Sequence, residues 1–359
     1  MKIYLSGYFH ENLGDDLFFH IITQRYAKHQ FYMMVHGDHA HAYRGRPNVK
    51  VHAQPKLLRG ADKILSKVSP NLGLGSLYGR TKEISVLIGG SMFQELYKDG
   101  SDLKRLAQMP QNRSKLYILG INYGPAKTMA YRDAVSRYLA SATDVCFRDR
   151  TSFELFQELP NARVGNDIVF GIRNICPAPA QKQNTCVISL IDFDAKPDLA
   201  PYKAAYLQFL RERILEQQAL GREVILTSFC RWEGDEKAIR ELKALCEPEV
   251  LEKLKTLCYD GHNWKELCNA FASASWVIST RFHAMVLGLV YQVPTVVISY
   301  SNKIRQLLRD MDRDNCAISP KNLANFPAEQ ICPVTDIDVK HWQNQAELHF
   351  EKLDALLRP

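Results

Sequence analysis

Cations recur in the first turn of three expected helices, each directly after an expected strand. The cations are Arg148 and Arg150, Arg281 and His283, and Lys303. The helices that follow them are expected over residues 153–159, 284–290 and 304–311. An exposed cation at the start of a helix opposes the helix dipole by about 0.3–1 kcal/mol, so this placement brings no structural gain. Helix N-termini bind phosphate through free backbone amides, which Arg, His and Lys reinforce, and the repeated pattern favours a bound anion.

Taken singly, each cation also has an ordinary explanation. A solvated turn, or a local salt bridge such as Arg148 with Asp144, accounts for one cation as well as an anion site does. Both interpretations stay open for each position, and only the recurrence favours an anion.

Glycines and polar residues also gather after two strands in the first half of the chain. After the strand over residues 2–5 come Gly7, Tyr8, Asn12, Gly14, Asp15 and Asp16, and after the strand over residues 84–88 come Gly89 and Gly90. Glycines let backbone amides approach a ligand, and Asn12 and Asp15 are good caps for a helix that opens at Leu17. A plain strand-to-helix turn explains Gly14 and one acid, but not the whole cluster.

The elements that must position these residues alternate along the chain. Short β-branched or apolar runs end in glycine or polar clusters and are followed by helical patterns. The runs are residues 2–5, 31–35, 84–88, 115–119, 144–147, 162–164, 185–190, 223–227, 276–279 and 295–299. The clearest helical patterns are residues 202–220, 235–246, 264–273 and 341–357. This alternation predicts an α/β protein whose parallel sheets are covered on both faces and bind ligands beyond the carboxyl ends of the strands.

The domain organisation follows from length and from one break in the pattern. A chain of 359 residues has room for roughly two domains of about 150 residues each. A polar, proline-containing stretch over residues 175–184 predicts the boundary. We expect an N-terminal domain over residues 1–180, a C-terminal domain over 181–335, and a closing helix within 336–359 that packs back on the N-terminal domain.

Composition narrows the class of protein. The chain is 46% hydrophobic and 24% charged, which is typical of globular proteins. Its longest apolar stretch, residues 284–291, is far shorter than the ~18 residues of a membrane-spanning helix. With no secretory signal and nine cysteines without a C-x-x-C pair, we expect reduced thiols and a cytoplasmic protein. The net charge of +7 fits an anionic substrate, an anionic membrane surface or nucleic acid.

No motif predicts a metal, a cofactor or a nucleic-acid partner. His36, His39 and His41 lie close together, but H-x-x-H-x-H without a neighbouring cysteine matches no common metal site. The chain also lacks a P-loop, a G-x-S-x-G elbow and a basic helix interleaved with aromatics. We therefore expect no metal, no cofactor and no nucleic acid.

In their order along the chain, these motifs resemble the polysaccharide pyruvyl transferases over about residues 1–311. The matching segments are Gly7-Tyr8, Asn12 to Asp16, Gly89-Gly90, Gly120 to Pro125, Arg148 to Ser152, Asp167, Ser279 to Ala284, Gln292 to Pro294, and Tyr300 to Lys303. Two positions depart from the family pattern, since Ser91 ends what is usually a glycine triplet and Asp16 ends what is usually Gly-Asp-Glu.

The resemblance implies a fold similar to GT-B glycosyltransferases, with two Rossmann-like domains facing a cleft. It implies a transferase that uses phosphoenolpyruvate as co-substrate and forms a cyclic pyruvate ketal on a sugar. The acceptor would belong to a surface polysaccharide (an exopolysaccharide) or to its lipid-linked precursor.

The resemblance also implies roles for site residues. His283 and Arg281 would be catalytic, His283 as the general acid, because a histidine pKa can lie near the working pH. Lys303 and one of Arg148 or Arg150 would join Arg281 in holding the anionic groups. The other expected substrate contacts are Asn12 and Asp16 on the acceptor side, Ser279, Gly89, Gly90, and Tyr8, which could equally be a wall residue.

Two other functions stay open. A nucleotide-sugar-dependent glycosyltransferase would bind a diphosphate with similar cations, although the Glu-x7-Glu pair of retaining members does not follow His283. The second alternative is a non-catalytic protein that binds sugar phosphates. Label transfer from phosphoenolpyruvate to a glycan separates an enzyme from a binder, and donor competition separates the two enzymes.

The charge predicts peripheral contact with anionic membranes. Each Lys or Arg near an anionic surface contributes about 1 kcal/mol, and salt screens the attraction. We expect the protein to sediment with phosphatidylglycerol-containing vesicles at low salt, less at high salt, and not with neutral phosphatidylcholine vesicles. Failure to sediment with anionic vesicles at low salt would contradict the prediction.

Overall fold

Strands form where runs of buried apolar residues were expected. In the computed structural model, all five residues of β4 (Ile84–Ile88) and all four of β12 (Thr295–Ile298) are buried. Continuous burial is typical of a parallel strand with helices on both faces. The structure describes residues 1–54, 78–97, 99–107, 109 and 115–358.

The chain forms two compact units. The first, here the N-terminal domain, comprises Met1–His10, Asp15–Gly171 and His341–Pro359. The second, the C-terminal domain, comprises Glu11–Gly14 and Ile172–Lys340. The main division thus falls between Gly171 and Ile172, nine residues before the expected position, and each domain includes a short segment from elsewhere in the chain.

The N-terminal domain contains a parallel sheet in the order β3-β2-β1-β4-β5-β6-β7. Its other strands are β1 (Lys2–Gly7), β2 (Gln30–His36), β3 (Val49–Gln54), β5 (Leu116–Ile121), β6 (Asp144–Phe147) and β7 (Ala162–Val164). Its helices are α1 (Leu13–Arg25), α4 (Ser101–Ala107), α5 (Met129–Ala140), α6 (Arg150–Glu154), α13 (Val339–Glu347) and α14 (Glu351–Leu357), with short 3₁₀ turns at Ala40–Tyr43, Ile168–Asn174 and Leu348–Phe350.

The C-terminal domain repeats this plan with a sheet in the order β10-β9-β8-β11-β12-β13. Its other strands are β8 (Thr185–Ser189), β9 (Glu223–Ser228), β10 (Leu254–Cys258), β11 (Trp276–Ser279) and β13 (Ala317–Ile318). Its helices are α7 (Lys203–Ala219), α8 (Asp235–Lys243), α9 (Pro248–Glu252), α10 (Trp264–Ser273), α11 (Phe282–Val290) and α12 (Asn302–Asp310), with 3₁₀ turns at Ala200–Tyr202, Arg231–Glu233, Asp314–Cys316, Pro320–Asn325 and Ala328–Gln330.

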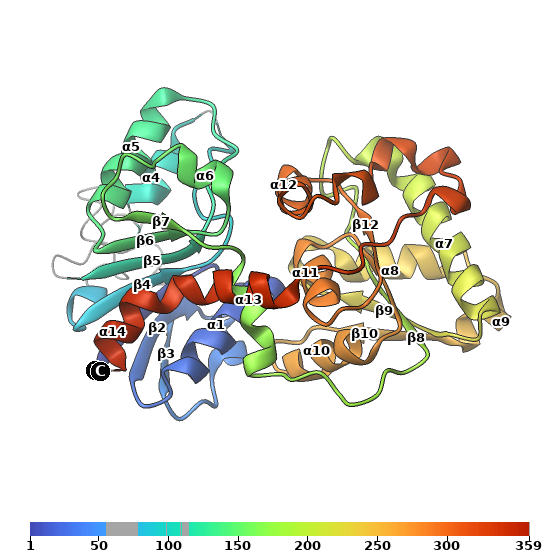
Figure 1. Cartoon of the computed structure of the whole chain (residues 1–359), viewed down its shortest axis with the longest axis horizontal. Helices are drawn as coiled ribbons and strands as arrows, with labels where there is room; N and C mark the ends of the chain where they lie inside the picture. Colours follow the sequence, from blue (N-terminus) through green and yellow to red (C-terminus); the bar gives the residue numbers. More distant parts are fainter. Residues whose placement is uncertain (55–77, 98, 108, 110–114, 359) are drawn as a thin grey trace. The chain divides into compact units, whose positions relative to one another are not determined.

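The strand order fixes where each sheet can bind a ligand. In both sheets the order in which successive strands are added reverses beside the first strand. This switch lies between β1 and β4 in one domain and between β8 and β11 in the other. In doubly wound sheets of this order, ligands bind beyond the carboxyl ends of the strands at that switch point. A site is therefore expected at the turns after β1, β4, β8 and β11, of which Figure 1 labels β4 and β8.

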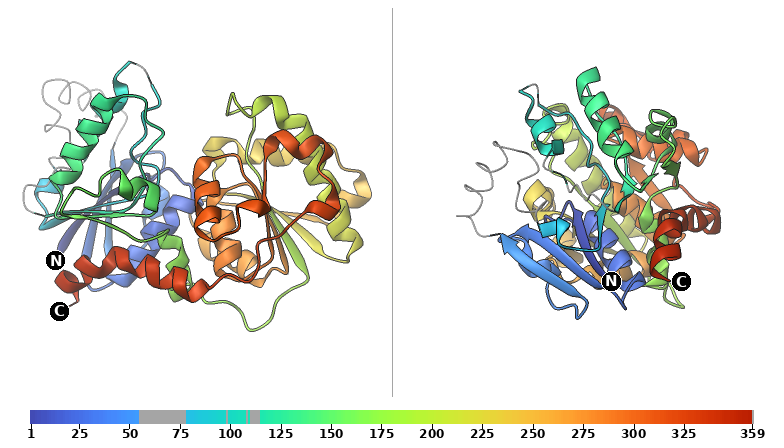
Figure 2. Two further views of the ribbon diagram at one scale, coloured as in Figure 1. Left: turned by 45° about the horizontal axis from the view of Figure 1, so that its top comes forward. Right: turned by 90° about the vertical axis from the view of Figure 1, so that its left-hand side faces the viewer.

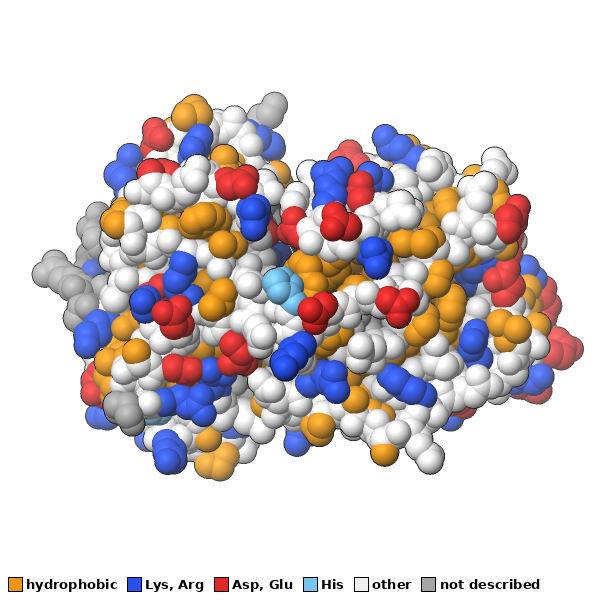
Figure 3. All heavy atoms as spheres, in the orientation of Figure 1, with side chains coloured by type: hydrophobic (Ala, Val, Ile, Leu, Met, Phe, Trp, Pro, Cys, Tyr) orange, Lys and Arg blue, Asp and Glu red, His pale blue; other side chains and the backbone are white. Residues whose placement is uncertain are grey.

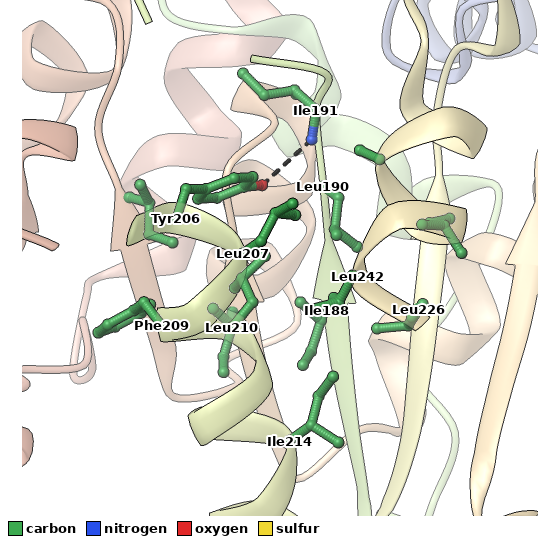
Figure 4. Packing of buried hydrophobic residues seen from close by; sticks show 14 of the residues in the cluster. Ile188, Leu190, Ile191, Tyr206, Leu207, Phe209, Leu210, Ile214, Leu226 and Leu242 are labelled. Atoms are coloured by element: carbon green, nitrogen blue, oxygen red, sulfur yellow. Dashed lines mark hydrogen bonds between the residues drawn. The ribbon is translucent and has the colours of Figure 1, made fainter. Parts of the chain in front are cut away.

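The C-terminal core explains why the turn after β8 is well fixed. Helix α7 buries Tyr206, Leu207, Phe209, Leu210 and Ile214 against the sheet (Figure 4). The hydroxyl of Tyr206 accepts a hydrogen bond from the backbone N–H of Ile191 at 3.3 Å, just beyond β8. A buried side chain of the core thus holds the first residues after the strand.

The last helices of the chain are bound to the N-terminal domain. Arg25 of α1 forms ion pairs with Glu347 and Asp354, and Tyr26 donates a hydrogen bond to Asp354 at 2.9 Å. His29 contacts both ends of the chain, with Nδ1 3.0 Å from the Met1 amino group and Nε2 2.9 Å from the Leu357 carbonyl oxygen. Both views in Figure 2 show the C-terminal helices, drawn in red, beside the strands and helices of the N-terminal domain.

Several predicted elements agree residue for residue with the structure. These are the strands at 84–88, 144–147, 162–164 and 276–279 and the helix at 264–273. The sequence pattern missed β3, β10 and the two-residue β13, all on the outer parts of the sheets. Among the described residues no helix has the length and apolar character needed to span a membrane.

A buried histidine makes the stability of the N-terminal domain sensitive to pH. His349 is fully buried, its Nδ1 accepts from Gly120 N–H at 3.2 Å, and its Nε2 is 2.6 Å from the Asn166 carbonyl oxygen, to which it must donate. Burial, reinforced by the charges of Arg163 and Arg148, lowers the pKa of His349 from 6.5 to about 4. Between these values the unfolded chain binds a proton that the folded chain does not bind.

We therefore predict that His349 contributes full stability above about pH 6.5 and loses it as the pH falls towards 4. The contribution lost is on the order of a few kcal/mol of unfolding free energy. Urea unfolding at pH 7 and pH 4.5 tests this prediction, because His349→Gln should show a smaller difference between the two pH values than the wild type. The exposed His341→Gln variant is the control. An equal pH dependence in wild type and His349→Gln would contradict the prediction.

Candidate functional site

The turn between β11 and α11 lies at the switch point of the C-terminal sheet and is held by buried hydrogen bonds. The hydroxyl of Ser189, at the end of β8, accepts from the backbone N–H of Thr280 at 3.1 Å and of Arg281 at 3.2 Å. The Thr280 hydroxyl lies 2.9 Å from the Tyr206 hydroxyl. Because all these groups are buried, the start of α11 has a single well-defined position.

Arg281 is the centre of a buried ion-pair cluster. Its Nε donates to Asp235 at 3.0 Å, its Nη2 donates to the other oxygen of Asp235, and its Nη1 donates to Glu233. Asp235 is fully buried and also accepts from the backbone N–H of Phe229 at 2.9 Å and of Cys230 at 3.0 Å. We call Arg281, Glu233 and Asp235 the Arg281 cluster.

The charges of this cluster are tightly coupled. Burial opposes the charged form of Arg281, but the carboxylates of Asp235 and Glu233 hold its pKa well above the usual value. Burial also opposes the charge of Glu233, yet the guanidinium of Arg281, helped by Lys196 and Lys303, lowers the pKa of this carboxyl below its usual value. The two carboxylates exceed the single charge of Arg281, so the two lysines complete the electrostatic balance.

His283 lies in the first turn of α11, one residue beyond its start at Phe282. Only 8% of the residue is exposed. The backbone of Gly14 packs directly against its ring, since a Cβ at Gly14 would stand 2.0 Å from His283 Nδ1. Only glycine at position 14 therefore leaves the imidazole in this position.

Lys303 reaches the same edge of the sheet from the next strand. Strands β11 and β12 are parallel neighbours, as the sequence predicted, and their turns lead into α11 and α12. The Lys303 ammonium lies 5.3 Å from the centre of the Phe282 ring. The structure thus brings together Arg281, His283 and Lys303, whereas the hydroxyl of Ser279 donates into the sheet, to the Val296 carbonyl at 3.2 Å.

A second arginine cluster lies at the carboxyl ends of the N-terminal sheet. Arg148, which follows β6, donates from Nη1 to Asp167 at 3.1 Å. Its Nη2 donates to Asn122 at 2.6 Å and contacts the Ser91 hydroxyl at 3.4 Å. We call Arg148, Asp167, Asn122 and Ser91 the Arg148 cluster. Its ion pair is with Asp167, while Asp144 pairs with Arg163 instead.

The two glycines after β4 are favoured for different reasons, Gly90 by its approach to Arg148 and Gly89 by its backbone conformation. A Cβ at Gly90 would stand 2.3 Å from Nη1 of Arg148, and Gly89 has a positive φ of 152°. Of the two arginines that the sequence offered, Arg148 is the buried one, whereas Arg150 is exposed at the start of the five-residue helix α6.

The residues expected after β1 divide between the two domains. Asn12 donates to Glu233 at 3.2 Å, so it extends the Arg281 cluster of the C-terminal domain. Asp16 is fully buried and accepts from the Tyr43 hydroxyl at 2.6 Å within the N-terminal domain. Tyr8 is 40% exposed and stacks on His10, with the ring centres 4.3 Å apart.

Two groups of side chains contain residues of the types that bind metal ions. Asp192, Asp194 and Glu241 offer carboxylate oxygens within 4.8 Å of one another, and Lys203 and Lys237 already pair with them. In the second group, the rings of His36 and His39 lie 5.9 and 5.0 Å from the ring of His10. Burial, with the charges of these neighbours, lowers the pKa of His10 to about 4.

Sequence reasoning missed the partners of both arginines. Both acids follow β9, Glu233 in the 3₁₀ turn Arg231–Glu233 and Asp235 as the first residue of α8, so acids beyond a strand's carboxyl end were the available signal. Asn122, which follows β5, lies in the segment Gly120 to Pro125 that resembles the family, but no contact of its side chain was predicted. Ser189 and Tyr206 had no signal, because their contacts join elements far apart in the sequence.

Comparisons with known proteins identify a matching family and structures with a similar fold. The model of the polysaccharide pyruvyl transferase family matches residues 12–302, the greater part of the chain. The match includes the residues of both arginine clusters. A search of curated protein sequences finds no match.

Several solved structures share the fold. A UDP-GlcNAc 2-epimerase from Methanocaldococcus jannaschii, in complex with UDP-GlcNAc and UDP, aligns with a TM-score of 0.62 at 8% identity, covering 99% of this chain and 100% of that chain. Anabaena Alr3699/HepE, in complex with UDP and glucose, aligns with a TM-score of 0.52 at 12% identity, covering 99% of each chain. With the two parallel-sheet α/β domains, these likenesses confirm the expected GT-B-like fold.

We predict that the contact between Gly14 and His283 is essential for the position of the ring. Gly14→Ala should displace the imidazole and lower the free energy of unfolding by about 1–3 kcal/mol through overpacking, partly offset by a gain in helix propensity. Urea unfolding and the histidine resonances in an NMR spectrum measure both effects. Gly171→Ala is the control, because its Cβ would meet only ordinary contact at 3.7 Å. Unchanged His283 resonances in Gly14→Ala would contradict the prediction.

Proposed function

Since this chain belongs to the polysaccharide pyruvyl transferase family, we propose that it transfers a pyruvyl group from phosphoenolpyruvate to a sugar as a cyclic ketal. The observation that carries the proposal is that His283 and Lys303 stand in the first turns of two helices that follow adjacent parallel strands. Helix N-termini and cations together suit a small anion with several charges, and phosphoenolpyruvate carries both a carboxylate and a phosphate.

His283 acts as the general acid in this proposal. It protonates the vinyl carbon of phosphoenolpyruvate, which gives an oxocarbenium-like centre at C2 that a sugar hydroxyl attacks. The attacking hydroxyl gives its proton to His283, which restores the acid, and phosphate leaves; a second hydroxyl of the sugar then attacks the same carbon and gives its proton to the released phosphate as the ring closes. The products are the ketal and inorganic phosphate. Contact with Gly14 fixes the ring of His283 for this role.

Arg281 has a more restricted role than a fully available cation would have. Three of its five N–H groups donate to Asp235 and Glu233, which leaves two for a donor. We propose that the Arg281 cluster orients the start of α11 and that Lys303 carries more of the contact with the donor. Lys196, whose ammonium lies 5.5 Å from the centre of the Tyr300 ring and whose charge acts on Glu233, adds positive charge.

The acceptor is assigned to residues of the N-terminal domain. The exposed ring of Tyr8, backed by His10, suits stacking against a sugar. Arg148 with Gly89 and Gly90 offers a rigid polar edge beside it, and Asp16 supports the helix that follows Tyr8. Asn12 belongs to the C-terminal domain and donates a hydrogen bond to Glu233 instead.

A second candidate is a nucleotide-sugar-dependent glycosyltransferase. It is favoured by the likeness of the fold to structures in complex with UDP and UDP-GlcNAc, and the same cations would suit a diphosphate. A sugar-phosphate binder without catalytic activity would use the same residues. The proposed setting is the cytoplasm, at exopolysaccharide assembly, with peripheral contact to the membrane. On the face drawn in Figure 3, Lys and Arg are interspersed with Asp and Glu.

Mass spectrometry of sugar acceptors tests the proposal. Candidate lipid-linked and nucleotide-linked sugars, incubated with the protein and phosphoenolpyruvate, should gain the mass of a pyruvyl ketal. His283→Asn should lower the rate by about 10²–10⁴-fold with little change in melting temperature, because a general acid contributes that much. His262→Asn, an exposed histidine of the same domain, is the control.

Three outcomes would count against the proposal. Transfer from a nucleotide sugar but not from phosphoenolpyruvate favours the second candidate. Binding without transfer favours a non-catalytic protein. A large loss of stability in His283→Asn with the rate per folded molecule preserved gives His283 a structural role instead.

A further inference from the structure

A cavity of about 200 Å³ lies beside the first turn of α12, at the carboxyl ends of β12 and β13 in the C-terminal domain. Figure 1 labels both β12 and α12. Among the residues that line it are Ser299, Ser301, Arg305 and Lys321. Its volume is below the roughly 300–1,000 Å³ of pockets that enclose a drug-sized ligand, so it suits one small group.

Two serine hydroxyls in this cavity lack hydrogen-bond partners among the described residues. Ser299 is only 4% exposed, and its Oγ is buried without a partner. Ser301 occupies the N-cap position of α12, where serine normally accepts from the backbone, but its hydroxyl makes no capping hydrogen bond and also has no partner. An unpaired buried hydroxyl is costly, and both of these belong to residues that line one cavity, where a bound group would be the nearest source of a partner.

The charged groups of the cavity favour an anion. Within the described part of the chain, neither Arg305 nor Lys321 has a side-chain ion pair or hydrogen bond, and Asp198 is the one acid among the lining residues. The first backbone N–H groups of the nine-residue helix α12 have no partner within the helix and add a positive partial charge. Hydroxyls, free N–H groups, a guanidinium and an ammonium together form a set of donors that matches phosphate.

This cavity is distinct from the position proposed for the donor. Lys303 lies beside Phe282 and acts on Glu233, so it serves the Arg281 cluster. Lys303 does not line the cavity, whereas Arg305 lies one half-turn further along α12 and does. The first turn of α12 therefore separates two groups of cations.

We propose that this cavity is a second anion site, which binds a phosphate of a diphosphate-linked sugar acceptor. The identification of the acceptor rests on the proposed function, but the site itself does not. A diphosphate linked to a lipid and one linked to a nucleoside offer the same chemistry to Ser299, Ser301, Arg305 and Lys321.

Calorimetric titration with inorganic pyrophosphate tests the site without any need for catalysis. Arg305→Gln should weaken pyrophosphate binding by about tenfold or more, as expected on loss of a charge-assisted hydrogen bond. Ser301→Ala, whose hydroxyl caps nothing, and Lys321→Gln should also weaken it. The matched control is Arg309→Gln, on the same helix, because Arg309 is exposed and pairs with Asp314. Lys303→Gln should weaken phosphoenolpyruvate binding and leave pyrophosphate binding nearly unchanged.

The outcomes distinguish this inference from the proposed function. It is overturned by no pyrophosphate binding at millimolar concentration, by affinity that depends on Lys303 and not on Arg305, or by affinity that no variant changes. If pyrophosphate binding follows Arg305 but no transfer from phosphoenolpyruvate occurs, the site stands and the proposed function fails. Titrations with a nucleoside diphosphate sugar and with a polyprenyl diphosphate sugar in detergent then identify the source, since Arg305→Gln should weaken only the true acceptor.

Discussion

The buried ion pair between Arg281 and Asp235 is the interaction on which the C-terminal site depends. A buried charge is tolerated only when its partner and its hydrogen bonds are in place, and removal of one partner typically costs about 3–5 kcal/mol. Asp235 satisfies this condition by accepting two backbone N–H groups as well as the guanidinium. The pair therefore joins the start of α8, which follows β9, to the start of α11.

The N-terminal domain uses the same arrangement at its own sheet. In each domain a guanidinium lies at the carboxyl ends of parallel strands and pairs with a carboxylate supplied by another element. In each, a glycine backbone packs closely against a predicted site residue, Gly90 against Arg148 and Gly14 against His283. Geometry of this kind holds polar groups rigidly before any ligand arrives, so binding costs little conformational entropy.

Burial explains which parts of this structure were readable from the sequence. The strand Ile84–Ile88 and the helix Trp264–Ser273 bury apolar residues in a clear pattern, so this pattern alone predicts their positions. The strands Val49–Gln54 and Leu254–Cys258 lie at sheet edges, where exposed polar residues remove that pattern. The cations at the helix starts were visible as residue types, and their adjacency followed from parallel neighbours. Their carboxylate partners could not be predicted. The contact of Arg281 with Asp235 requires the strand order β9-β8-β11, which no local sequence pattern encodes.

The exchange of short segments between the two domains has a consequence for synthesis. Residues 341–358 belong to the N-terminal domain, where His349 satisfies the backbone of Gly120 and Asn166 and α14 pairs with Arg25. Domains commonly fold as units from the N-terminus while the ribosome is still translating the chain. Here the first domain to be made is the last to be completed, because its strands end at Val164 while the residues 341–358 that pack against them are translated after the whole of the second domain. During that interval the surface that α13 and α14 will cover is exposed to solvent. This is therefore the stage of synthesis at which we expect a chaperone to bind.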